Sequence, residues 1–197
     1  LPRNTEGGNL YLYDASTGSK IVGGTIAYGN VLGLDAEGNP IYGPVAKGGN
    51  AVGLGRTEFG GTAVIRDGYA ASRGGNISLF NNGSFKITGG TISGGVCGVY
   101  ATNKSTLIIT GGTISGGYGV NAHDNSTVKI SGGTITGGTE GVMNKGITTI
   151  SGGTISSDKV AVRGTNVTIS GGSISGGEYD LSDYSEEGAI TLTVGEK

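Results

Sequence analysis

A nine-residue sequence returns five times in this chain at almost regular steps. It reads ITGGTISGG at 87–95 and 109–117, and close variants of it begin at Ile130, Ile150 and Ile169. The steps between the first isoleucines are 22, 21, 20 and 19 residues. A period near 20 residues is typical of solenoid proteins, in which a repeat buries its apolar side chains only by stacking on its neighbours. This repeat constrains the fold more than any other feature of the sequence.

Each repeat contains three short strand-like pieces separated by glycine-rich turns. One piece contains the first isoleucine, as in LIIT and VKIS, a second reads TIS or TIT, and a third opens the unit, as in GGNISL and YGVNA. Apolar residues alternate with small or polar ones in these pieces, which is the pattern of a strand with one buried face. Extending the period to Ile21 and Ile65 upstream and to Ile190 downstream predicts about eight coils of 19–22 residues.

We therefore predict an all-β fold, a single-stranded right-handed parallel β-helix with three short parallel sheets. Stacking the coils at about 4.8 Å places isoleucine over isoleucine and completes the backbone hydrogen bonds. The right-handed form is expected because the circuit is longer than three hexapeptide turns. The range 1–197 is expected to be one domain with a C-terminal cap over about 179–197. Because the sequence begins without Met, we expect it to be a piece of a larger protein.

One segment breaks the period. Residues 30–47 add about 18 residues between the first and second units, and GLDAEGNPIYG within them reads as a turn between two extended arms. This favours a hairpin that projects from the solenoid, and an irregular extra coil is the alternative.

Composition excludes several classes of function. Glycine accounts for 44 of 197 residues and the net charge is −2, without a basic run that would bind nucleic acid. No apolar stretch approaches the length of a membrane span. The single cysteine, Cys97, cannot form an internal disulfide and is expected to pack as a small buried residue. With one histidine, His123, no metal site is expected, and no cofactor is predicted.

The repeat at 74–95, GGNISLFNNGSFKITGGTISGG, resembles the glycine-rich right-handed β-helix repeats of large surface proteins of anaerobic Gram-positive bacteria. More distantly it resembles the pectate-lyase-like superfamily. The resemblance covers about 7–195 and implies the fold with more force than the function, because such folds host lyases, hydrolases, adhesins and passive stalks. It also implies an extracellular or bacterial cell-surface location.

We call the first isoleucine of each repeat its anchor isoleucine. A column of polar residues is predicted six residues before each anchor isoleucine. It contains Asn81, Asn103, Asp124, Asn144 and Arg163. This column is either an asparagine ladder that only supports the turns, or a groove for a sugar to which Lys104, Asn125 and Lys145 contribute. Aromatic side chains that could stack on sugar rings are a further set. Strand alternation is expected to turn Tyr11, Tyr13 and Tyr100 outward, and Tyr42 lies on the predicted hairpin.

Two other functions are alternatives. A polysaccharide lyase or glycoside hydrolase would need clustered acids and a base, for which the irregular segments offer Asp35, Glu37, Arg66 and Asp67. An ice-binding face could be formed by paired hydroxyl residues of the second piece: Thr91/Ser93, Thr113/Ser115, Thr134/Thr136, Thr154/Ser156 and Ser173/Ser175. Threonine and serine are also ordinary residues of a solvated strand face.

The sequence thus favours a non-catalytic extracellular module of a bacterial surface protein that serves in adhesion or binds polysaccharide. The expected partner is a polysaccharide or a host or cell-surface glycan, without nucleic acid or membrane. An uncovered N-terminal coil could also contact a neighbouring domain or another copy end to end.

Overall fold

The computed structural model describes residues 10–12, 19–27, 31–34, 40–42, 51–53, 56–68, 75–79, 82–183 and 189–192. For several of the short strands, including those at 10–12, 31–34, 40–42, 51–53 and 189–192, it describes the backbone only. The described residues form strands joined by turns, bends and short irregular pieces, and they contain no helix that could span a membrane.

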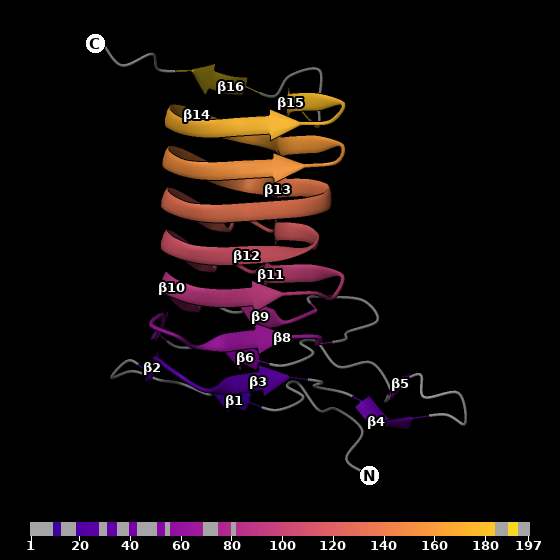
Figure 1. The fold of residues 1–197 in the computed structure, drawn as a ribbon. Helices are drawn as coiled ribbons and strands as arrows, with labels where there is room; N and C mark the ends of the chain where they lie inside the picture. The colour runs from indigo at the N-terminus through magenta and orange to yellow at the C-terminus, as the bar shows by residue number, and fades with distance from the viewer. Residues whose placement is uncertain are drawn as a thin grey trace.

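The described strands stack as successive coils of a parallel β-solenoid with three faces (Figure 1). In Figure 1 the near-face strands run from left to right while the chain rises from the N-terminal to the C-terminal end, which is the sense of a right-handed coil. The predicted all-β parallel solenoid is confirmed.

The first face contains the anchor isoleucines. Its strands are β2 (Ser19–Ile21), β7 (Arg56–Phe59), the first parts of β10 (Ser84–Ser93), β12 (Thr106–Ala122) and β13 (Thr127–Ser157), the middle part of β14 (Val160–Gly176), and β16 (Ala189–Leu192). β13 returns to this face at 147–150. Ile87 pairs with Ile109, and Ile109 pairs with Ile130, in parallel register. The nonamer therefore repeats because each isoleucine lies against the isoleucine of the next coil.

The second and third faces complete each circuit. The second face consists of β3 (Thr25–Ala27), β8 (Val64–Arg66) and the later parts of the long strands. The third consists of β1 (Leu10–Leu12), β6 (Ala51–Gly53), β9 (Ile77–Leu79), β11 (Cys97–Ala101), further parts of β12, β13 and β14, and β15 (Tyr179–Ser182). The long strands run on through the corners, where the pairing register between neighbouring coils shifts.

The core is one continuous cluster that fills the inside of the coils. Ile92, Ile114 and Ile135 line it from the second face and are fully buried, and Val99 and Val120 line it from the third. Burying such a side chain stabilises the fold by about 1.5–3 kcal/mol, so the stacked columns supply most of the apolar stabilisation.

The predicted coil count was too high. Within the part of the chain that the structure describes, the solenoid has about five turns, whereas the period predicted about eight coils. The five turns lie in the continuous segment 82–183, and the shorter strands before and after it extend individual faces.

Two of the predicted anchors were also wrong. Phe59, rather than Ile65, pairs with Ile87, because the second unit is longer than the others and a step of 22 residues reaches an isoleucine of the second face. At the other end Leu192, rather than Ile190, pairs with Ile169.

The strands β4 (Val31–Leu34) and β5 (Pro40–Tyr42) form a separate antiparallel sheet. This is the strand pairing of the hairpin predicted within 30–47.

Candidate functional site

The corner between the third and first faces is built from two-residue turns with left-handed backbone. At 102–105 the central residues Asn103 and Lys104 have φ values of 53° and 61°, and at 123–126 Asp124 and Asn125 have φ values of 50° and 59°. Two successive residues with positive φ are the signature of a type I′ turn. Asparagine and aspartate tolerate this conformation better than other side-chain-bearing residues, which explains their recurrence here.

Hydrogen bonds hold these turns to one another along the solenoid. The Asn82 N–H donates to the Asn103 carbonyl over 3.0 Å, and the Lys104 N–H donates to the Asp124 carbonyl over 3.0 Å. The buried Thr102 hydroxyl donates to Asp124 Oδ2 over 2.6 Å. The backbones of successive corners are therefore fixed in register, and so are the points from which their side chains project.

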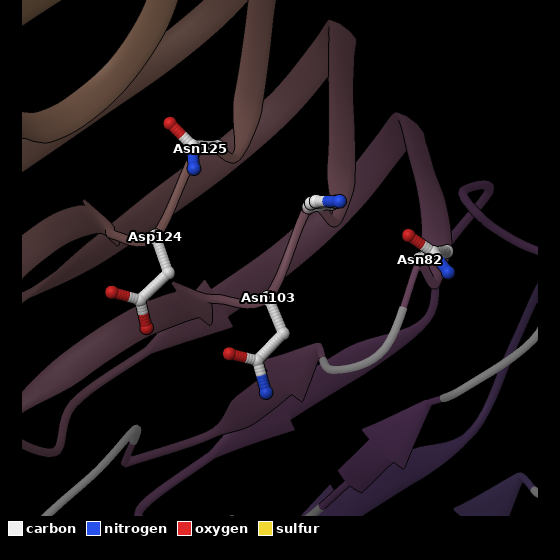
Figure 2. Close-up of a pocket in the computed structure, with 5 residues that line it drawn as sticks. Asn82, Asn103, Asp124 and Asn125 are labelled. Atoms are coloured by element: carbon white, nitrogen blue, oxygen red, sulfur yellow. The ribbon is translucent and has the colours of Figure 1, made fainter.

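We call the exposed residues of three successive corners the polar corner: Asn82, Asn103, Lys104, Asp124 and Asn125. Together they line an open hollow of about 490 Å³. In Figure 2, Asn103 and Asp124 project in the same direction from adjacent coils. The hollow thus contains three amides, one ammonium group and one carboxylate.

Several polar groups of the polar corner are available to a ligand. Within the part of the chain that the structure describes, the side chains of Asn82, Lys104 and Asn125 make no hydrogen bond or ion pair. They are exposed, as are Asn103 and Asp124. Amide, carboxylate and ammonium groups can together donate to and accept from the hydroxyl groups of a sugar.

The polar corner ends at the fourth turn because that turn is two residues shorter. Four residues separate Ala122 from Thr127, whereas two separate Asn144 from Ile147. Asn144 pairs with Ala122 and is fully buried. Its side-chain amide donates to Thr148 Oγ1 over 2.7 Å and its Oδ1 accepts from the Gly146 N–H over 2.7 Å.

This shortening overturns part of the predicted column. Asn103 and Asp124 lie at the corner as predicted, but Asn144 faces the core, and Arg163 lies opposite Met143 on the third face. Lys145 is exposed but does not line the hollow. Of the eight polar residues predicted for the sugar groove, the structure brings together Asn103, Lys104, Asp124 and Asn125. Asn81 lies outside the described residues.

Sequence reasoning missed Asn82 as a member of the hollow, because it counted six residues back from Ile87 and selected Asn81. The usable sequence signal was the offset of five residues that selected Lys104 and Asn125, since Asn82 lies five residues before Ile87.

The tyrosine predictions have a mixed outcome. Tyr100 does face away from the core, because its neighbours Val99 and Ala101 face into it. It is not an exposed stacking surface, since only 9% of it is accessible and it packs with Cys97 and Tyr118. Cys97 is buried as predicted. The side chains of Tyr11 and Tyr42, and all of Tyr13, lie outside the described residues.

The alternative catalytic set is only partly described. Arg66 Nη1 and Asp67 Oδ2 form an ion pair at 2.5 Å between exposed neighbours in sequence. Asp35 and Glu37 lie outside the described residues, so their distance from this pair stays a prediction. No group of three potential metal ligands occurs in the described ranges.

The predicted hydroxyl columns lie in register on the second face. Thr113 pairs with Thr134, and Thr154 with Ser173. The isoleucines between them point into the core, so the hydroxyl side chains form the outer surface of this face.

A buried ion pair on the third face was not predicted. Glu140 is 4% exposed, and its Oε1 lies 3.2 Å from Arg163 Nη1. Burial raises the pKa of Glu140, and the Arg163 guanidinium lowers it by a smaller amount.

No protein-family model, no curated protein and no solved structure matches the chain. The resemblance to bacterial surface repeats therefore remains a prediction from the sequence.

Proposed function

We propose that the chain is a non-catalytic carbohydrate-binding module that holds a polysaccharide at the polar corner. The observation that carries this proposal is the hollow itself, in which fixed turns of three successive coils present amide, ammonium and carboxylate side chains to solvent. Because the backbone of these turns is already ordered by hydrogen bonds, binding does not have to order it, which favours affinity.

The composition of the hollow supports binding rather than hydrolysis. Glycoside hydrolases of the usual kind use two carboxyl groups on either side of the scissile bond. Among the five residues that line the hollow, Asp124 is the one carboxylate, and it accepts a hydrogen bond from Thr102. A lysine and three amides supply contacts for hydroxyl groups but no second acid.

An extracellular location and a role in adhesion at a bacterial cell surface belong to the same proposal. They rest on the resemblance of the repeat to the β-helix repeats of bacterial surface proteins. A solenoid that binds glycans is compatible with a location at the cell surface. The partner would then be a polysaccharide or a cell-surface glycan.

The proposal is tested by screening the chain on a glycan array and by incubating it with each bound polysaccharide while reducing ends are measured. Binding without release of reducing ends is expected. Release of reducing ends would establish an enzyme and contradict the non-catalytic reading. If no glycan binds on the array and no reducing ends are released, glycan binding is contradicted and the chain is better described as a spacer.

The regular hydroxyl face favours ice binding as a second candidate, since a flat array of threonines in register can match a lattice. Serine interrupts the array at five positions, Ser93, Ser115, Ser156, Ser173 and Ser175. Thermal hysteresis of freezing solutions measures this activity directly. A hysteresis gap that disappears when Thr134 is replaced by a bulky residue would favour ice binding over the polar corner.

A further inference from the structure

The polar corner repeats along the solenoid axis with the spacing of the coils. Asn82, Lys104 and Asn125 are equivalent positions on three successive corners. The Asn82 N–H donates to the residue before Lys104, and the Lys104 N–H donates to the residue before Asn125. Neighbouring strands of a sheet lie about 4.8 Å apart, so the three positions span two such steps. The side chains form a short row parallel to the axis.

We propose that the ligand is an extended, β-linked polysaccharide strand that lies along this row with one sugar on each coil. This inference rests on the proposed function and specifies its substrate class. Equatorially linked pyranose rings in an extended chain advance by nearly the coil spacing, so successive rings meet successive corners. A curved, α-linked chain does not keep this match beyond one or two rings.

The row also has a definite end. At the fourth corner the shorter turn buries Asn144 and leaves Lys145 outside the hollow, so the hollow itself ends at the third corner. Within the described residues, the three corners that line the hollow thus correspond to three sugar subsites.

The charge of the side chains changes from one corner to the next, and this constrains the ligand further. The middle corner carries the ammonium group of Lys104 and the third carries the carboxylate of Asp124. A divalent cation would be repelled by Lys104, and a small anion by Asp124. Uncharged hydroxyl groups satisfy both side chains, so a neutral polysaccharide fits this row.

Titration calorimetry with three series of oligosaccharides tests the inference on the whole chain. The probes are cello-oligosaccharides, N-acetylchito-oligosaccharides and malto-oligosaccharides of one to six sugars. Because a hydrogen bond contributes about 0.5–1.5 kcal/mol net, affinity in one of the β-linked series is expected to rise roughly two- to tenfold per added sugar. The rise should stop at three sugars, and the α-linked series should show no such rise.

Three results would overturn the inference while leaving glycan binding intact. They are equal affinity for one and three sugars, a rise that continues to six sugars, and an equal rise in the α-linked series. Failure of both β-linked series while the array shows binding to another glycan would also overturn the substrate class. If no glycan binds in any assay, the proposed function fails first.

A grafted corner provides a second test. Replacing residues 144–146 with the five-residue sequence of 122–126, together with Thr148→Val to match Val128, restores the longer turn at the fourth corner. The plateau should move from three sugars to four. A folded graft whose plateau stays at three would contradict the row, and if the graft does not fold, the length series on the unmodified chain decides.

Discussion

Asn144 occupies the same position in the sheet as Ala122 of the preceding coil, yet it places a polar amide inside the solenoid. The amide is satisfied within its own turn, by Thr148 Oγ1 on one side and the Gly146 N–H on the other. This pair allows the fourth corner to close with two residues fewer, and it thereby ends the polar corner.

We expect Asn144→Ala to lower the free energy of unfolding by more than Thr148→Val does. The alanine leaves both Thr148 Oγ1 and the Gly146 N–H without partners, and each buried unsatisfied group costs about 1–3 kcal/mol. The valine removes one hydrogen bond and places at 148 the residue type found at 128. Urea denaturation of both variants measures the order, and a larger loss in Thr148→Val would contradict this account of the corner.

Glycine is required at the corner between the first and second faces. Gly112 has a φ of 87°, and a Cβ atom there would lie 2.7 Å from the Gly89 carbonyl oxygen. We expect Gly112→Ala to destabilise the fold by roughly 1–2 kcal/mol or more, from left-handed strain alone. Gly138→Ala is the matched control, since its Cβ would have no neighbour closer than 3.8 Å and its φ is not left-handed. Equal melting temperatures for the two variants would argue against close stacking of the corners.

Core isoleucines should differ in importance with their place along the solenoid. Ile109 is fully buried between neighbouring coils, whereas Ile174 near the C-terminal end is only partly buried. We expect Ile109→Ala to cost about 2–5 kcal/mol, and Ile174→Ala less. Chemical denaturation tests this ranking, and a reversed order would mean that the end coil carries more of the core than its burial indicates.

Stability should depend on pH through Glu140. Because the pKa of Glu140 is raised in the folded state, its neutral form is favoured there relative to the unfolded chain. The contribution of Glu140 to the free energy of unfolding is fully present below its pKa in the unfolded chain, about 4.3. This contribution is lost as the pH rises through the higher pKa of the folded state. With rising pH the unmodified chain should therefore lose stability relative to Glu140→Gln, because the glutamine does not ionise. A difference that changes in the opposite sense would show that Arg163 outweighs burial.

The isoleucine register of 87–169 could be predicted from the sequence because a strict repeat leaves one way to stack the coils. The irregular units could not, since Phe59 replaces isoleucine in the second unit and spacing alone then selects Ile65. The two residues missing from the fourth corner also made spacing alone select wrong positions. A gain of one residue between Gly137 and Glu140 offsets part of the shortening, so the distance to Ile150 looked regular while Asn144 moved into the core.

The candidate site followed the same pattern. Asn103, Lys104 and Asn125 were predicted because their units obey the period, whereas Lys145 was placed with them by an offset that the short turn breaks. The cover over Tyr100 depends on side chains of adjacent coils, among them Tyr118, which strand alternation does not reveal.

The central claim is that the polar corner binds glycan, and a matched pair of lysine variants tests it most directly. Lys104 lines the hollow, and Lys145 is the exposed lysine of the next corner outside it. Calorimetric titration with the tightest-binding β-linked trisaccharide should show at least a severalfold loss of affinity for Lys104→Ala and none for Lys145→Ala, with both variants melting like the unmodified chain. Equal affinities for the two variants and the unmodified chain would contradict the claim.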